Sequence, residues 1–184
     1  MKTLKLGTRG SALALKQAEM TEAALGEAFP ELEVERVIIK TTGDRRTDVA
    51  LNEVAKAEGI WDKGVFIKEL EVALEAGEID VAVHSLKDLP TVLEDPFQLR
   101  SVLERAPVAD AWIGKIPWSE VKKGSRVGTS SVRRERQAKF LKPGAKVVDL
   151  RGNVPTRIKK AALDADYDGI ILAEAGLKRL GYPT

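Results

Sequence analysis

Short apolar runs alternate with amphipathic stretches along this chain, a pattern typical of α/β proteins. In the first half, the pattern predicts strands at 2–8, 32–40 and 79–84, and helices at 11–29 and 64–76. Glu22 falls at the edge of the apolar face of the first helix, whose residues are Ala14, Leu15, Ala18, Leu25, Ala28 and Phe29. The polar stretch between the second strand and the second helix is too long for an ordinary connection. A connection of this length, from Thr41 to about Lys63, is either functional or disordered.

The second half repeats the alternation. The pattern predicts strands at 111–114, 126–128, 146–150 and 169–173, and helices at 132–141 and after Asn153, a possible cap. A strand-like stretch at 98–103 lies between Pro96 and Pro107, which favours a domain change there. We expect one α/β domain over 1–103 and a second over 104–184. The second has few strands and the chain closes on no helix or strand, so we expect a fragment.

Composition narrows the class of protein. Hydrophobic residues make up 43% and charged residues 32% of 184 positions, which is typical of a soluble globular protein. The apolar runs are too short to cross a bilayer, and the amino terminus lacks a signal-peptide core, so a cytoplasmic protein is expected. The absence of cysteine excludes disulfides and thiolate metal sites, and a single histidine makes a zinc site unexpected. Phosphate-binding glycine motifs are also absent.

Polar side chains follow many of the predicted strands. Because ligands in α/β folds bind at the carboxyl ends of strands, these groups are expected to gather at a cleft between two lobes. Between 122 and 136 there are six Lys or Arg and one acid, around a Gly-Thr-Ser-Ser turn. Arginines and helix N-termini in such places indicate a polyanionic ligand. Asp88 is an acid among the basic residues that follow the predicted strands. Its spacing favours a helix cap or a salt bridge to Lys87 or a nearby Arg, and the alternative is a carboxylate that transfers protons or holds a cation.

Seven strings occur in one order and carry a family resemblance. They are GTRGSALA (7–14), TGD (42–44), KGVFIKELE (63–71), AVHSLKDLP (82–90), GTSSVRR (128–134), LRGNVPTR (150–157) and LAEAGLKRL (172–180). In these strings, which span nearly the whole chain, the sequence resembles the porphobilinogen deaminase (hydroxymethylbilane synthase) family.

The resemblance implies two lobes like those of type II periplasmic binding proteins, with the active-site cleft between them, and a third domain that is absent here. It implies a transferase of porphyrin and haem biosynthesis that polymerises four porphobilinogen units, releases ammonia and yields the tetrapyrrole hydroxymethylbilane. The porphobilinogen and the growing polypyrrole chain are then the expected partners. A dipyrromethane cofactor is implied too, but its attachment cysteine is not present in this sequence. The isolated chain is therefore expected to be inactive.

The resemblance also implies site residues. Asp88 matches the catalytic carboxylate that protonates the leaving amine and stabilises the resulting cation. Substrate and cofactor binding is implied for Arg9, Ser11, Gln17, Lys63, Phe66, Ser85, Lys87, Thr129, Ser131, Arg133, Arg134, Arg151 and Arg157. The loop 43–63 resembles a mobile lid, although its end departs from the usual Gly-Gly-Lys-Gly pattern before Phe66.

Two other functions are consistent with parts of the pattern. A non-catalytic module that binds carboxylates on the same two-lobed fold would explain the arginines, but not an acid among them. A nucleic-acid binder is disfavoured by the net charge of only +2 and by the 5% content of aromatic residues. We expect a monomer that works without nucleic acid, membrane or bound metal.

Overall fold

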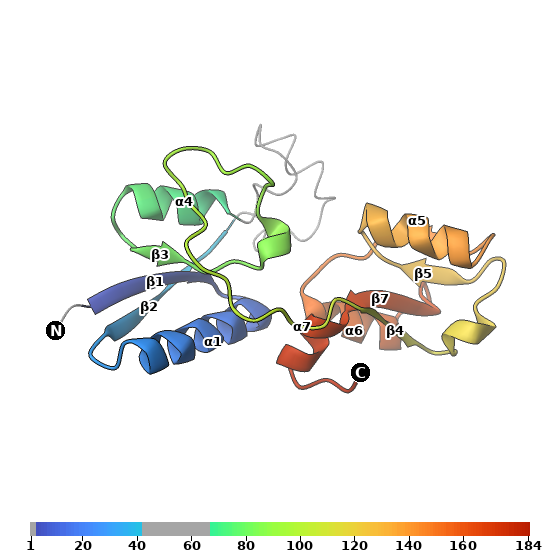
Figure 1. Cartoon of the computed structure of the whole chain (residues 1–184). Helices are drawn as coiled ribbons and strands as arrows, with labels where there is room; N and C mark the ends of the chain where they lie inside the picture. Colours follow the sequence, from blue (N-terminus) through green and yellow to red (C-terminus); the bar gives the residue numbers. More distant parts are fainter. Residues whose placement is uncertain (1–2, 42–66) are drawn as a thin grey trace. The chain divides into compact units, whose positions relative to one another are not determined.

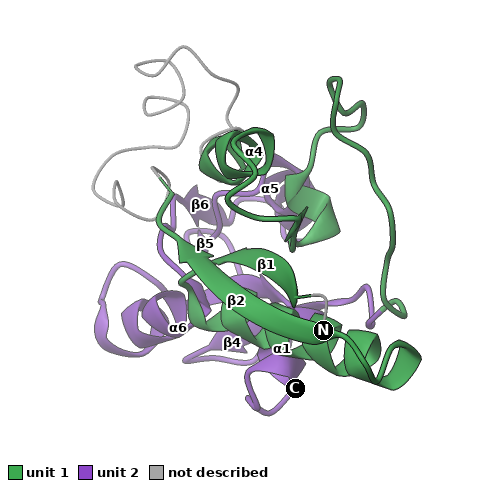
Figure 2. Cartoon of the chain, turned by 90° about the vertical axis from the view of Figure 1, so that its left-hand side faces the viewer, with its two compact units in different colours: residues 1–105 green, residues 106–184 purple. Residues whose placement is uncertain are grey.

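The computed structural model describes residues 3–41 and 67–184. Within it the chain divides into two compact units, residues 1–105 and 106–184, which are described separately (Figures 1 and 2). Both units combine a parallel or mixed sheet with helices, so the expected α/β class is confirmed. The division falls two residues beyond the domain boundary expected from the sequence.

Unit 1 contains a three-stranded parallel sheet. Its order is β2 (Glu33–Ile39), β1 (Thr3–Arg9) and β3 (Val81–Ala82), with β1 in the centre. Two helices cover its opposite faces, α1 (Ala12–Ala28) on one and α4 (Lys68–Glu75) on the other (Figure 1). The predicted strand 79–84 is shorter than expected, because only two residues pair fully with β1.

The helices of unit 1 differ in how they pack. Helix α4 buries Leu70 and Ala73 against Ile79, which forms a small core with β2. Helix α1 buries only Ala18, and Phe29 at its end is 58% exposed, so its expected apolar face is wrong at that position. Glu22 accepts from Arg36 of β2 at 2.6 Å. Glu22, which interrupts the apolar face of α1, therefore forms an ion pair with the neighbouring strand.

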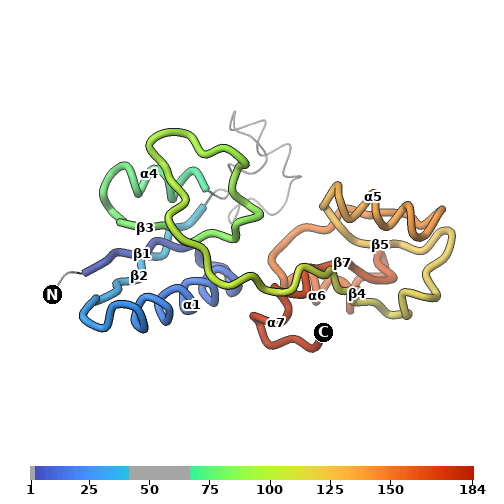
Figure 3. Tube along the Cα trace, viewed as in Figure 1, coloured from blue at the N-terminus to red at the C-terminus, as the bar shows by residue number. Residues whose placement is uncertain are grey.

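The predicted strand 98–103 is wrong. Residues 89–109 contain no helix or strand, as the chain trace shows (Figure 3). Leu99 and Val102 are 53% and 63% exposed. An extended segment becomes a strand only when a neighbour takes up its backbone hydrogen bonds. The described residues provide no such neighbour for this segment.

Unit 2 contains a four-stranded sheet in the order β4-β7-β5-β6. Its members are β4 (Asp110–Gly114), β7 (Gly169–Ala173), β5 (Arg126–Gly128) and β6 (Lys146–Val148). Only β4 runs antiparallel to its neighbour. Helix α5 (Val132–Leu141) covers one face, while α6 (Val154–Leu163) and α7 (Glu174–Arg179) cover the other (Figure 1).

Alternation along the strands builds a core on each face of this sheet. Ile170 and Leu172 of β7 pack with Tyr167 and Leu177 on the α6 side. Ile171, between them, faces the opposite cluster with Val127. This is the period of two that places successive side chains on opposite faces. Helices α5 and α6 pack on opposite faces of this sheet, and the loops that precede them follow the carboxyl ends of β5 and β6. No helix in the described ranges is long and apolar enough to cross a membrane.

Candidate functional site

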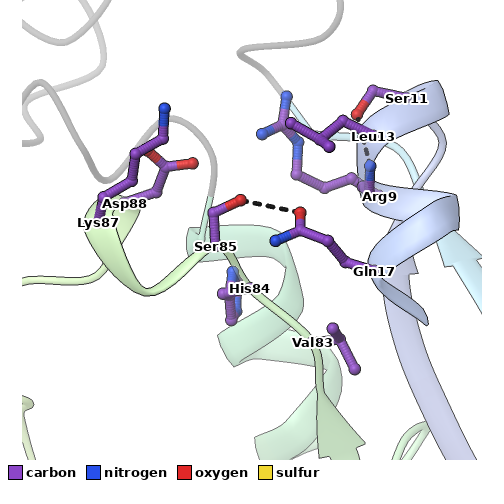
Figure 4. Close-up of a pocket in the computed structure, with 10 residues that line it drawn as sticks. Arg9, Ser11, Leu13, Gln17, Val83, His84, Ser85, Lys87 and Asp88 are labelled. Atoms are coloured by element: carbon purple, nitrogen blue, oxygen red, sulfur yellow. Dashed lines mark hydrogen bonds between the residues drawn. The ribbon is translucent and has the colours of Figure 1, made fainter. Parts of the chain in front are cut away.

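A pocket of about 80 Å³ opens in unit 1 at the carboxyl ends of β1 and β3, enough for several water molecules. Its lining comes from two segments that lie far apart in the sequence. The residues are Arg9, Ser11, Leu13, Ala14, Gln17, Val83, His84, Ser85, Lys87 and Asp88. Six of them are among the site residues expected from the sequence, and Figure 4 shows Asp88 and Arg9 beside the same opening.

The start of α1 shapes one wall of this pocket. Ser11 is the N-cap, and its hydroxyl accepts from the backbone N–H of Ala14 at 3.3 Å. Arg9 ends β1, so the turn between strand and helix presents its side chain beside the helix N-terminus. The positive end of the helix dipole and the guanidinium favour the same anion.

The opposite wall follows β3. Ser85 precedes the short 3₁₀ helix Leu86–Asp88, which places Lys87 and Asp88 at the rim. The Ser85 hydroxyl donates to Oε1 of Gln17 at 2.8 Å and joins the two walls (Figure 4). With its oxygen engaged, Gln17 keeps its amide N–H groups available as donors.

His84 also lines the pocket. Burial, and secondarily the positive charge of Arg9, lower the pKa of His84 to about 4. The imidazole is therefore neutral near pH 7. In Figure 4 its ring lies below Ser85, away from Asp88. His84 therefore adds no charge to the pocket near pH 7, and Asp88 is the carboxyl group of its lining.

In unit 2, the loop between β5 and α5 resembles a helix-terminal anion site. Thr129 is 4% exposed, and its hydroxyl accepts from the backbone of Ser131 at 3.2 Å. Ser131 caps α5 and accepts from the backbone of Arg134. Ser130 donates to the carbonyl of Leu150 at 2.6 Å, which ties this loop to the next one.

The two adjacent arginines of α5 share one acid, Asp110, which the sequence reasoning missed. Arg133 and Arg134 approach its carboxylate at 2.8 and 2.7 Å. Burial alone would raise the pKa of Asp110, but the hydrogen bonds from the two arginines outweigh burial and hold that pKa below its usual value. No local sequence signal marks Asp110, since only the sheet brings the start of β4 beside α5.

The loop at 151–153 is built tightly around Gly152, whose φ of +115° favours glycine. The Arg157 Nε donates to the Gly152 carbonyl at 2.6 Å, and Lys160 Nζ donates to the Arg151 carbonyl at 3.3 Å. Among the described residues, the buried Nη1 of Arg151 has no hydrogen-bond partner. A buried cationic donor in this condition fits an anionic ligand.

The expected residues thus form one group in unit 1 and another in unit 2. Lys63, Phe66 and the loop 43–63 lie outside the described residues. Within the described ranges, no cluster of three or more His, Asp or Glu side chains is placed to hold a metal ion. Both groups carry cations suited to carboxylates. Each also contains an acid, which is Asp88 at the unit 1 pocket and Asp110, paired with two arginines, in unit 2.

Comparisons with known proteins identify the family. The model described as "Porphobilinogen deaminase, dipyromethane cofactor binding domain" matches residues 4–184. The porphobilinogen deaminase of Syntrophomonas wolfei is 48% identical, over 98% of this chain and 58% of that protein. Those of Geotalea uraniireducens and Xanthomonas oryzae are 44% and 47% identical, over 55% and 58% of their own lengths. The chain therefore spans less than two thirds of these curated relatives.

Among solved structures, the methionine binding protein MetQ is 15% identical, with a TM-score of 0.46 over 97% of this chain and 73% of that chain. At this TM-score the similarity does not define the fold. The family match covers residues 4–184, and the 48% identity to the Syntrophomonas wolfei protein extends over 98% of this chain. This chain belongs to the porphobilinogen deaminase family.

Proposed function

We propose that this chain supplies the substrate-binding and proton-transfer residues for joining four porphobilinogen units into hydroxymethylbilane, with release of ammonia. The observation that carries the proposal is Asp88, a carboxylate that lines the same pocket as Arg9 and Lys87. A module that only binds carboxylates gains nothing from an acid there, because like charges repel. An enzyme that must protonate an amine and hold a cation needs one.

Charge distribution supports a polycarboxylate substrate. Each porphobilinogen carries an acetate and a propionate, so every added ring brings two carboxylates. Residues 106–184 carry 16 Lys and Arg against 8 Asp and Glu, a net +8, whereas residues 1–105 carry 14 against 20, a net −6. Arg133, Arg151 and Arg157 belong to the basic unit. We assign them, together with Arg9, to the carboxylates of the incoming porphobilinogen and of the growing chain.

Asp88 is assigned the proton transfers. In its acid form it protonates the aminomethyl group, and ammonia leaves with the electrons of the carbon–nitrogen bond. As a carboxylate it stabilises the cation left on the incoming ring. When the terminal ring carbon of the chain forms the new carbon–carbon bond, Asp88 accepts the proton that this carbon loses. Ser11, Gln17, Ser85 and Lys87 orient the incoming ring by hydrogen bonds and charge. Lys63 and Phe66 are also assigned to binding of the substrate or the cofactor.

The residues fit the dipyrromethane group in one respect only. Its carboxylates suit Thr129, Ser131 and the orphaned Nη1 of Arg151, whereas Arg134 is buried against Asp110 and the Ile171 carbonyl and supports this region from within. When bound, the group supplies the terminal pyrrole on which the chain is extended. The 184 residues contain no cysteine, so a thioether anchor does not come from this sequence.

We further propose that the protein acts as a cytoplasmic monomer, without nucleic acid or membrane.

The first test is the intact mass of the protein as its native host makes it. The folded protein is exposed to porphobilinogen, and its mass is then measured under denaturing conditions. We expect a species heavier than 20.1 kDa that carries a covalent ladder of added pyrrole units. A mass of 20.1 kDa without any adduct would reject the enzyme and favour the carboxylate-binding module.

The second test replaces Asp88. In the same host protein, Asp88→Asn should leave porphobilinogen affinity within about threefold of wild type, since it removes an acid and no cationic contact. The ladder of added units should disappear. Asp95→Asn, an exposed acid of unit 1 outside the pocket, serves as the matched control and should retain the ladder. A ladder that persists in Asp88→Asn contradicts the assigned role.

A further inference from the structure

The acid at the start of β4 is placed to govern the two arginines at the start of α5. We infer that Asp110 is a positioning residue, which fixes Arg133 and Arg134 so that the free edge of Arg133 receives a ligand carboxylate. The inference rests on the proposed function, because it takes Arg133 as a contact of the ligand. All three residues belong to unit 2.

One carboxylate divides its two oxygens between the two guanidinium groups. Oδ1 of Asp110 accepts from Nε of Arg134 at 2.9 Å, and Oδ2 accepts from Nη1 of Arg133 at 2.8 Å. The Asp110 side chain is 19% exposed, so water screens this arrangement only weakly. Each oxygen has a different arginine, and neither guanidinium can rotate without losing a charge-assisted hydrogen bond.

Arg134 forms the internal part of this arrangement. Its side chain is 9% exposed, its Nη2 lies 2.7 Å from Oδ1 of Asp110, and its Nη1 donates to the Ile171 carbonyl at 3.4 Å. All three nitrogens therefore meet acceptors on β4 or β7. Removing the acid would leave a buried cation uncompensated, which is costly in proteins.

Arg133 forms the external part. Its side chain is 58% exposed, and Nη1 donates both to Asp110 and to Oε1 of Gln137 at 2.8 Å. Within the described part of the chain, its Nε and Nη2 have no hydrogen-bond partner. These two donors form one edge of the planar guanidinium, which matches a carboxylate in bidentate fashion. Asp110 and Gln137 thus hold the inner edge and leave this outer edge open.

Charge supports the same division. Two guanidinium groups on consecutive residues repel each other, and one carboxylate between them cancels one of the two charges. One net positive charge remains for the ligand, at a fixed place beside the Ser131 cap of α5. Without the acid, Arg133 would be free to swing into solvent, and the ligand would have to order it again on binding.

The test is a double-mutant cycle on porphobilinogen affinity, measured by calorimetry on the protein as its native host makes it. Asp110→Asn should weaken binding about tenfold, and Arg133→Gln at least as much. If Asp110 acts through Arg133, the double variant should bind no more weakly than Arg133→Gln alone. Asp166→Asn is the matched control, because it breaks an exposed ion pair with Arg126 in the same unit, and it should bind normally. Equal weakening by Asp110→Asn in both backgrounds overturns the inference and leaves the proposed function standing.

A measurement without ligand covers the other outcomes. Phenylglyoxal modifies accessible arginines, and peptide mass spectrometry reports the rate at Arg133. We expect Asp110→Asn to raise that rate several-fold in folded protein, whereas Asp166→Asn leaves it unchanged. If wild type does not bind porphobilinogen, the proposed function fails, and an unchanged rate at Arg133 then overturns the inference as well. If Asp110→Asn does not fold, Asp110→Glu takes its place in both measurements. Its effect on porphobilinogen binding should likewise be absent in the Arg133→Gln background.

Discussion

At the scale of the residue, burial and the charge of Arg9 set the protonation state of His84 in the unit 1 pocket. His84 stays neutral there because its environment disfavours the imidazolium, with a pKa near 4. The unfolded chain has no such environment, so its histidine titrates near pH 6.5. Between these two values the unfolded state binds more protons than the folded state, and the free energy of unfolding must rise with pH.

His84 therefore predicts a specific acid sensitivity. Above pH 6.5 its contribution is fully favourable, and it is lost as the pH falls toward 4. We expect wild type to lose about 2 kcal/mol of unfolding free energy between pH 7 and pH 5 through this group alone. His84→Gln should lack that part of the loss in urea titrations at the two pH values. An equal loss in both proteins would contradict the shifted pKa.

Residue identities could be predicted where a motif marks them, and not where the fold alone assembles them. Asp88, Arg9 and Ser85 each follow a strand in a recognisable string, and the structure brings all three to one pocket. Asp110 has no such string. Its partners come from α5, and only the antiparallel pairing of β4 with β7 brings them together. Period and propensity carry no information about a contact of this kind.

At the scale of the element, local rules explain where helices begin. Ser11, Ser131 and Asn153 each accept from the backbone N–H three residues later, as N-caps do. Such signals are local, so the starts of α1, α5 and α6 could be predicted from the sequence. The order of the strands could not be, and the segment 98–103 looked like a strand because β propensity does not reveal whether a neighbour exists.

The cap of α6 gives the second prediction. Oδ1 of Asn153 accepts from both the backbone N–H and the hydroxyl of Thr156, at 3.0 and 2.8 Å. Asn153→Ala should cost about 1 kcal/mol of unfolding free energy in urea denaturation. Asn153→Asp keeps the acceptor and serves as the control, with a stability close to wild type. A loss of similar size in both variants would place the effect outside the cap.

Two glycines that meet no neighbouring atoms give the third prediction. Gly26 lies inside α1, whereas Gly77 has a φ of +68°, a conformation that alanine rarely adopts. Gly26→Ala should raise the unfolding free energy by about 0.5–1 kcal/mol, because it removes backbone entropy from the unfolded chain. Gly77→Ala should lower it by about 1 kcal/mol. Thermal denaturation of the two variants compares them, and shifts of the same sign would refute the backbone argument.

At the scale of the whole molecule, charge is unevenly divided. The net charge of +2 conceals a unit of −6 and a unit of +8, which the total alone does not reveal. A unit this basic attracts any polyanion at low ionic strength, so the sign of the charge cannot by itself separate a carboxylated pyrrole from a nucleic acid. The distinction must come from how the charges are arranged.

The arrangement favours small carboxylates. Asp110 takes up part of the charge of Arg133 and Arg134, Asp166 lies beside Arg126, and Glu135 pairs with Lys139. Trp112 and Trp118 pack edge to face in the core cluster under α5, and Phe140 of α5, which is 83% exposed, is a single ring rather than a platform for successive bases. Phosphate contacts and exposed aromatic rings are what single-stranded nucleic acids require.

We therefore expect mixed oligonucleotides to bind only at low salt. Fluorescence anisotropy should show no binding of a labelled 20-mer at about 150 mM NaCl, where unpaired surface charges are screened. Porphobilinogen binding should decline less over the same range, because hydrogen bonds and partly buried charge pairs are screened less than exposed ones. Measuring both ligands on one preparation makes each the control for the other. If oligonucleotide binding persists at that salt while porphobilinogen binding vanishes, the basic unit serves nucleic acid and the carboxylate assignment of its arginines is wrong.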